Sequence, residues 1–155
     1  MAQINFSHSD QIGFMQGRLS PIRNGRIQSF PWETWRDEFE EASKVSLRKM
    51  EWTIDTEDFF SNPILRPIGQ EEIKSLKSLY NFEIPSVTCD YFMENPPWKS
   101  DTEHLFACIE SILLGMTAIG AKILVIPLVD NSSPGDSNEV SQVVHFFSRM
   151  SNLLL

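Results

Sequence analysis

Hydrophobic and polar residues alternate in four short segments of the chain, and a period of two is typical of β-strands. The expected strands are Gln11–Leu19, Lys49–Asp55, Pro85–Asp90 and Lys122–Leu128. Successive strands begin 37 residues apart, counted between the equivalent positions Ile12, Lys49, Ser86 and Ile123. This regular spacing indicates a repeated strand–helix unit rather than four unrelated strands.

Each expected strand is followed by a segment in which apolar residues recur every three or four positions, as on one face of a helix. The expected helices are Pro31–Leu47, Gln70–Tyr80, a helix that begins near Ser100 and ends near Gly120, and a helix from about Asn138 onward. Their expected inward faces are Trp32, Trp35, Phe39, Ala42 and Val45; Ile73, Leu76 and Leu79 or Tyr80; Leu105, Ile109, Ile112, Met116 and Ile119; and Val140, Val143, Val144, Phe147 and Leu154. Ser100 and Glu103 have capping-box spacing, Pro31 suits a helix start, and Gly120 suits the position just past a helix end.

The strand–helix alternation predicts an α/β fold with a parallel sheet, because parallel strands need a crossover that usually contains a helix. At this length we expect a single domain over residues 1–155. Two architectures are compatible with four such units: a small open doubly wound sheet, or half of a (βα)8 barrel, which as a whole takes about 250 residues. The last expected helix stops at Leu155 without a cap signal, and this favours the (βα)4 half of a TIM barrel.

The charge of the chain disfavours anionic partners. It carries 13 Lys and Arg against 21 Asp and Glu, a formal net charge of −8, so neither nucleic acid nor a membrane is an expected partner. The longest apolar stretch, 112–129, contains Lys122 and Pro127 and is interpreted as a helix end followed by a strand, not as a membrane span. With two cysteines, no CxxC motif and no leader-like start, a soluble cytoplasmic protein is expected.

Polar residues gather where the expected strands end, and the carboxyl ends of parallel strands form the functional edge of such sheets. The candidate substrate-binding residues are Arg18 on the first strand, Glu51 and Asp55 on the second, Asp90 on the third and Asp130 after the fourth. One arginine and four carboxylates are therefore expected along a single rim. Carboxylates accept hydrogen bonds from the hydroxyls of a sugar or polyol, and an arginine suits a carbonyl oxygen or a phosphate.

Each of these residues also has a structural interpretation. Asp55 and Asp130 are equally suited to capping the next helix or bonding loop amides. Glu51 lies within a strand and needs a partner, either an arginine inside the sheet or a substrate. Arg18 is also suited to bridging neighbouring loops. Asp90 is the best candidate, because two small polar residues precede it on the same face of the strand.

Several other chemistries find no support in the residues. The P-loop, GxGxxG, GxSxG and HExxH motifs are absent. The histidines fall in the N-terminal segment and on two expected helices, so we expect no metal site built from His8, His104 and His145. Cys89 alternates with Asp90 and is expected in the core, as are Trp32 and Trp35. Trp98, in a loop, is interpreted as part of a lid or as a loop anchor.

Five segments resemble sugar phosphate isomerases/epimerases, which are TIM barrels of the xylose-isomerase-like superfamily. They cover nearly the whole chain in order: Ile12–Pro21 (IGFMQGRLSP), Arg26–Trp35 (RIQSFPWETW), Met50–Asp55 (MEWTID), Ser86–Met93 (SVTCDYFM) and Ile126–Ser133 (IPLVDNSS). The resemblance implies a barrel that isomerises or epimerises a ketose or sugar phosphate. It also implies a divalent metal (Mn, Mg or Co) and two glutamates that move the proton beside the carbonyl. Abasic-site endonucleases of the same superfamily use strand-end histidines, which this sequence lacks.

The match departs from the family in one respect that concerns chemistry. In these families the metal ligands and the glutamate pair come chiefly from the second half of the barrel, which this chain does not contain. The catalytic residues are therefore unknown, no metal is supported by this chain alone, and only the substrate-facing rim carries over. The segment Val45-Ser46-Leu47 also differs, since relatives usually have a glycine there.

A half barrel leaves its first and last strands as open edges, and open edges pair with what is available. We therefore expect one of three states: a truncated and inactive chain, a homodimer that closes eight strands, or an open sheet that binds a ligand without turnover. The expected function is that of a sugar phosphate isomerase/epimerase, incomplete as this chain. The alternative is a non-catalytic sugar- or metabolite-binding fragment or an inactive relic.

Overall fold

The computed structural model describes residues 12–22, 25, 29–96, 98–99 and 102–151. Its strands are β1 (Phe14–Met15), β2 (Lys49–Ile54), β3 (Glu83–Cys89) and β4 (Ile123–Val125). Its helices are α1 (Asp37–Lys44), α2 (Pro67–Tyr80), α3 (Tyr91–Glu94), α4 (Thr102–Ile119) and α5 (Ser137–Ser151), with the 3₁₀ turns η2 (Phe59–Ser61), η3 (Pro63–Leu65) and η4 (Asp130–Ser132). The predicted alternation of strands and helices is confirmed.

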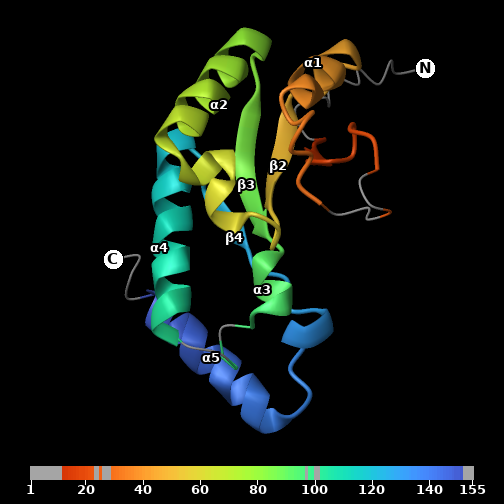
Figure 1. Cartoon of the computed structure of the whole chain (residues 1–155). Coiled ribbons are helices and arrows are strands. Elements are labelled where there is room, and N and C mark those ends of the chain that lie inside the picture. The colour runs from red at the N-terminus through yellow and green to blue at the C-terminus, as the bar shows by residue number, and fades with distance from the viewer. Residues whose placement is uncertain (1–11, 23–24, 26–28, 97, 100–101, 152–155) are drawn as a thin grey trace, which may run out of the picture.

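The four strands form one parallel sheet in the order β1-β2-β3-β4, so that spatial order follows chain order. Parallel crossovers are almost always right-handed, and a sheet that grows in one direction therefore receives its helices on one face. α1 packs on α2 and α2 packs on α4, and Figure 1 shows α2 and α4 following one another along the sheet. A doubly wound sheet reverses its strand order, and the described strands contain no such reversal.

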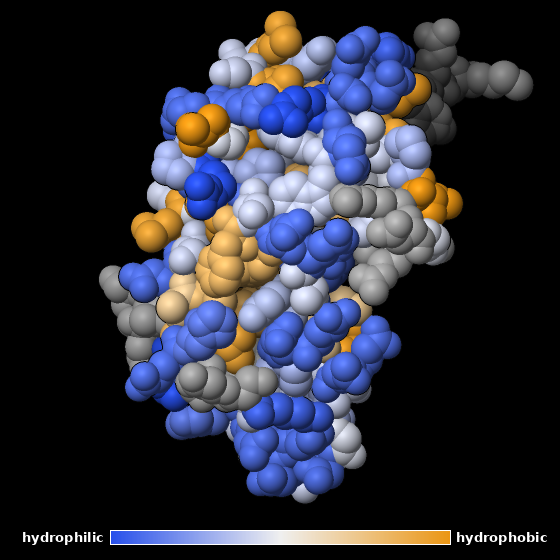
Figure 2. All heavy atoms as spheres, viewed as in Figure 1, coloured by the Kyte–Doolittle hydropathy of each residue, from blue (hydrophilic) through white to orange (hydrophobic). Residues whose placement is uncertain are grey.

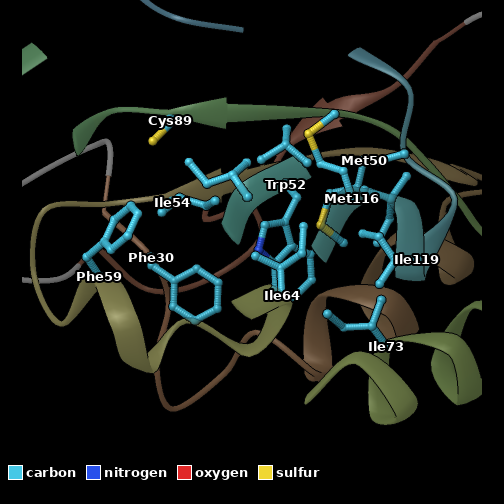
Figure 3. Close-up of a cluster of buried hydrophobic side chains, with 14 of the residues drawn as sticks. Phe30, Met50, Trp52, Ile54, Phe59, Ile64, Ile73, Cys89, Met116 and Ile119 are labelled. Atoms are coloured by element: carbon cyan, nitrogen blue, oxygen red, sulfur yellow. The ribbon is translucent and has the colours of Figure 1, made fainter. Parts of the chain in front are cut away.

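The hydrophobic core lies between the sheet and these helices. In β2 the alternate residues Met50, Trp52 and Ile54 are fully buried, and Figure 3 shows them in one cluster with core residues such as Ile64. The Trp52 ring is also packed against two other aromatic rings, with centroids 5.4 Å and 5.6 Å away. Burial of this one face of β2 is what the period of two in the sequence predicts.

Two glycines let α2 and α4 approach the η3 turn closely. A Cβ atom on Gly69 would overlap the carbonyl oxygen of Pro63, and a Cβ atom on Gly115 would overlap that of Ile64. Neither helix can carry a side chain at these positions without moving away from η3. The close approach places both helices against the loop that follows β2, and this loop closes one side of the core.

Most predicted helix faces are confirmed, and α5 is the main exception. Every predicted inward residue of α4 is buried. In α5, Val143 is buried as expected, whereas Val140, Val144 and Phe147 are exposed. The buried face instead contains Phe146, whose ring stacks on Phe106 of α4 at 5.5 Å. α5 has apolar residues on more than one side, and only its neighbour decides which side is covered.

Smaller corrections concern the ends of helices. The helix expected from Pro31 begins at Asp37, because the intervening residues form turns. Val45 is exposed and not inside as predicted, because it lies past the end of α1. Of the two alternatives Leu79 and Tyr80, Leu79 is exposed and Tyr80 is partly buried against the core. Ser100, Leu154 and His8 lie outside the described residues, so the capping box is not described.

The helices α1, α2 and α4 end in the same way. Each is followed by one residue with a positive φ angle, namely Ser46 (63°), Asn81 (49°) and Gly120 (80°). In each case the next residue donates a backbone hydrogen bond to the carbonyl oxygen five positions earlier, as in Leu47 to Ala42, which is the bond of a Schellman motif. Gly120 is confirmed in this role, and Ser46 holds it without being a glycine.

Candidate functional site

The face of the sheet that points away from the helices is polar. Glu51 and Thr53 lie on it from β2, and Ser86 and Thr88 lie on it from β3. The carboxylate of Glu51 accepts hydrogen bonds from the hydroxyls of Ser86 (2.9 Å) and Thr88 (2.5 Å). In the described part of the chain, the hydrogen-bond partners of Glu51 are thus hydroxyls of the neighbouring strand and not an arginine.

A cavity of about 350 Å³ lies where β2, β3 and β4 end. It is lined by Asp55, Thr56, Asp90, Met93, Glu94, Asp130 and Asn131, and we call it the acidic cavity. Three of the five predicted substrate-binding residues, Asp55, Asp90 and Asp130, therefore line one space. Figure 2 shows hydrophilic residues covering the surface around α3 and the segment after β4.

Two carboxylates in the acidic cavity have oxygens without a partner. Asp55 and Asp90 are only 7% and 8% exposed, and neither the Oδ2 atom of Asp55 nor the Oδ1 atom of Asp90 makes a hydrogen bond within the described residues. The other oxygen of Asp55 accepts from the backbone N–H of Thr56 at 2.7 Å. A buried acceptor without a partner costs about 1–3 kcal/mol. A ligand that donates hydrogen bonds here would recover that cost.

The structure also distinguishes a helix-capping or loop-bonding role from a ligand-binding role for each of the three aspartates. Asp90 occupies the N-cap position of α3, but its side chain makes no capping hydrogen bond there. Asp55 bonds a loop amide with one oxygen only. Asp130 is exposed and adopts a positive φ of 53° at the start of η4. Asp90 is thus the residue for which a structural role accounts least.

Burial, together with the nearby carboxylates of Asp55 and Glu51, raises the pKa of Asp90 to about 6, although Arg18 opposes the increase. A carboxyl group with a pKa in this range exists in both protonation states near neutral pH, and this property suits a general acid or base. The raised pKa also shows that Glu51, although hydrogen-bonded to β3, acts electrostatically on the same cavity.

Arg18 lies beside the acidic cavity rather than in it. Its side chain is exposed, and one guanidinium nitrogen donates to the sulfur of Met15 at 3.6 Å. It is not one of the residues that line the cavity. Its influence on the pKa of Asp90 shows that its charge reaches the site, so the structure brings Arg18 to the predicted edge but not into the same space.

A buried glutamate that the sequence analysis missed holds the loop around Arg18. Glu38 of α1 is fully buried, and its carboxylate accepts the backbone N–H groups of Gly17 (2.9 Å) and Leu19 (3.0 Å). Burial raises the pKa of Glu38. The signal was present in the sequence, because Glu38 follows Trp35 by three positions, on the apolar face of α1, where a charge is unusual.

The end of β2 is held by two buried amides, neither of which the sequence marks. Asn62 accepts the indole N–H of Trp52 (3.0 Å) and donates to the carbonyl oxygen of Thr53 (3.1 Å). The side-chain oxygen of Gln16 accepts the backbone N–H of Thr53 at 3.1 Å. Together they fix the backbone two residues before Asp55 and so position that carboxylate.

The remaining candidate residues lie away from this edge. Cys89 is fully buried, and burial raises the pKa of its thiol far above the ordinary value, so the predicted core role is confirmed. His104 and His145 are exposed on α4 and α5. Trp35 is in the core, Trp32 is partly buried against it, and Trp98 is partly buried in a loop.

The metal that the family resemblance implies does not fit the described residues. No three His, Cys, Asp or Glu side chains among them are grouped so that they could hold a metal ion. Asp55, Asp90, Glu94 and Asp130 share a cavity, yet they do not converge on one point in this way.

Comparisons with protein families and with curated proteins do not indicate a function, so the geometry of the site is the main guide to it. No model of a known protein family matches the chain, and no curated protein matches it. None of the described helices combines the length and the apolar character that crossing a membrane requires. The class that the structure defines is an α/β fold with four parallel strands in sequential order and alternating helices.

Proposed function

We propose that this chain is the substrate-binding half of a sugar isomerase or epimerase, a (βα)4 half of a TIM barrel whose acidic cavity binds the hydroxyls of a ketose. The observation that carries the proposal is the pair of buried, unpartnered carboxylate oxygens of Asp55 and Asp90 at the carboxyl edge of the sheet. The sequence resemblance described above supports the same class.

The layout of the sheet supports the half-barrel part of the proposal. In a TIM barrel the strands follow one another in order, the helices cover the outside, and the face away from the helices is the interior. The sequential order β1-β2-β3-β4 and the polar face that carries Glu51 agree with this layout. Barrel enzymes bind substrates at the carboxyl ends of the strands, which is where the acidic cavity lies.

The chemistry that we assign to this chain is binding and proton handling. Asp55 and Asp90 accept hydrogen bonds from adjacent hydroxyls of the sugar, and this fixes the carbonyl carbon relative to the sheet. With a pKa of about 6, Asp90 accepts or returns a proton at neutral pH more readily than an ordinary aspartate. We assign no step to a metal, because the described residues do not form a site for one.

A second candidate is sugar binding without turnover. The hydrogen bonds of Glu51 favour it, because both oxygens of this carboxylate are engaged by Ser86 and Thr88. An enzyme that moves a proton between neighbouring carbons often uses two carboxylates, and in this arrangement Glu51 is less available as the second. Binding and turnover therefore need to be measured separately.

The test is ligand-detected NMR on the purified chain with a panel of ketoses in deuterated buffer. We expect at least one unphosphorylated ketose to bind, and we expect Asp90→Asn to weaken that binding at least tenfold. Glu83→Gln is the matched control, because Glu83 is an exposed carboxylate at the opposite end of β3. If no ketose binds, or if Asp90→Asn binds as the unmodified chain does, the proposal is wrong.

The same samples distinguish the two candidates. Deuterium that enters the carbon beside the carbonyl of the bound ketose would establish proton transfer by this chain. Binding without such incorporation would favour the second candidate, sugar binding without turnover.

A further inference from the structure

The residues that line the acidic cavity are unbalanced in charge. Four of the seven are carboxylates, Asp55, Asp90, Glu94 and Asp130, and none is a lysine, arginine or histidine. Glu51, below the cavity on the same face, adds a further negative charge that raises the pKa of Asp90. The space where we place the sugar therefore has a strongly negative potential.

Among the described residues, the two cations that reach the acidic cavity, Lys99 and Arg18, do not cancel this potential. The ammonium group of Lys99 donates to the carbonyl oxygen of Asn131 at 3.5 Å, but it also pairs with Glu139 at 2.9 Å. Together with the backbone N–H of Gly135, this pairing lowers the pKa of Glu139, so the lysine charge is already compensated. Arg18 opposes the raised pKa of Asp90 without reversing it.

We infer that the acidic cavity selects its sugar by charge, taking an amino sugar in preference to the neutral sugar and excluding the phosphorylated one. The inference rests on the proposed function, because it assumes that the cavity is the sugar site. The inference narrows the set of expected ligands from any ketose or sugar phosphate to ketoses without an anionic group.

Hydrogen bonding and charge favour the same ligand. The free oxygens of Asp55 and Asp90 can only accept hydrogen bonds when ionised, and an ammonium group brings three donors and no acceptor. Charge-assisted hydrogen bonds are about twice as strong as neutral ones. A phosphate group brings acceptors and two further negative charges, so it would meet the same carboxylates with repulsion and without partners.

The size of the acidic cavity argues for a whole sugar rather than an ion. Pockets that bind small molecules are commonly about 300–1,000 Å³, and this cavity has about 350 Å³. A bare metal ion would need several oxygens around one point, and the described carboxylates are not grouped in that way. A ligand with several separated donors can instead reach Asp55 and Asp90 at the same time.

The experiment compares three ketoses that differ only at carbon 1: 1-amino-1-deoxyfructose, fructose and fructose 1-phosphate. Dissociation constants are measured by NMR titration of the full chain at pH 7.0 and low salt. We expect the amine to bind at least tenfold more tightly than fructose, and fructose to bind at least tenfold more tightly than the phosphate. Raising the salt concentration to 0.5 M should reduce both ratios, because screening weakens the charge term.

Three outcomes overturn the inference, and they can be told apart. If fructose binds but the three constants are equal or reversed, charge selection is wrong while the proposed function stands. If none of the three ligands binds, the inference is wrong, and the proposed function is wrong as well only if no ketose of the panel described above binds. A phosphate that binds tightly in the unmodified chain but weakly in Arg18→Ala would mean that Arg18 captures the phosphate, which also contradicts the inference.

The ratio of amine to fructose affinity, measured in variants and at different pH values, tests the charge of the aspartates, because a merely structural role would not change it. Asp55→Asn and Asp90→Asn should each lower the ratio of amine to fructose affinity at least threefold, whereas Glu83→Gln should leave it unchanged. In the unmodified chain the ratio should fall as the pH is lowered through about 6, because Asp90 takes up a proton there. Asp55, Glu51, Glu94 and Asp130 are the other acids that face this region, with Arg18 as the opposing charge.

Discussion

The two faces of the sheet differ in whether their buried groups have partners, although both faces are built from the same strands. On the helix-covered face, Trp52, Ile54 and Val87 are fully buried apolar side chains in contact with other apolar groups. On the other face, Asp55 and Asp90 are nearly as buried but keep oxygens without hydrogen-bond partners. Burial of the apolar side chains on the first face stabilises the folded state, whereas the unpartnered aspartate oxygens on the second face destabilise it.

This contrast indicates what each face is for. Buried polar groups in proteins are almost always hydrogen-bonded, and exceptions are concentrated where function requires them. Neither aspartate is needed to hold the sheet together, because the backbone of β2 and β3 is paired along the strands and the helices cover the apolar face. We therefore interpret the polar face as a binding surface that the apolar face stabilises.

The largest effect is expected from breaking the apolar face at Trp52. Trp52→Ala removes a fully buried indole that contacts two aromatic rings and Asn62. Deletion of a buried tryptophan costs about 3–5 kcal/mol, which is a large part of the stability of a small domain. Urea unfolding measures the loss, and Trp52→Phe is expected to cost less. A loss below about 1 kcal/mol would contradict the described packing.

A smaller effect is expected at Asn62, which joins the two faces. Asn62→Ala leaves the Trp52 N–H, the Ile64 N–H and the Thr53 carbonyl without their partner. We expect a loss of about 2–3 kcal/mol in the free energy of unfolding, since orphaned buried polar groups carry their desolvation cost. Ketose binding should also weaken, because the end of β2 would no longer be fixed. Unchanged stability in urea would show that water replaces the amide.

The smallest effect concerns neither face but the turn that leads into β2. Ser46 adopts a φ of 63°, a conformation that glycine tolerates more easily than serine. Ser46→Gly should therefore raise the free energy of unfolding by about 0.5–1 kcal/mol. Ser43→Gly, three residues earlier inside α1, is the matched control and should lower it by about as much. Destabilisation by both variants would contradict the assigned turn.

The fold was largely predictable because its signals are local. Alternation of apolar residues depends on burial of one strand face, and it located all four strands along the chain. The first and fourth strands, Phe14–Met15 and Ile123–Val125, are shorter than the expected Gln11–Leu19 and Lys122–Leu128. The predicted inward face of α5 is wrong because apolar residues such as Val144 and Phe146 lie on different sides of the helix. Contact between Phe146 and Phe106 decides which side is buried. The four-residue helix α3 is too short to show a helical period.

The site was predictable only in part, for a similar reason. Asp55, Asp90 and Asp130 could be placed together because parallel strands end at a common edge. Glu94 could not, since it reaches the acidic cavity through α3. The hydrogen bonds of Glu51 depend on the register of β2 against β3, which pairs Glu51 with Ser86, and the sequence contains no signal for that register.

The most direct test of the central claim is the pH dependence of unfolding for Asp90→Asn and the unmodified chain. Because the pKa of Asp90 is raised to about 6 in the folded state, its contribution to stability is present at low pH and is lost as the pH rises through about 6. The account predicts equal stability below pH 4 and an Asp90→Asn variant that is more stable at pH 7.5, by on the order of 2 kcal/mol. A variant that is less stable at pH 7.5 would show that Asp90 is a paired structural carboxylate, contradicting the account.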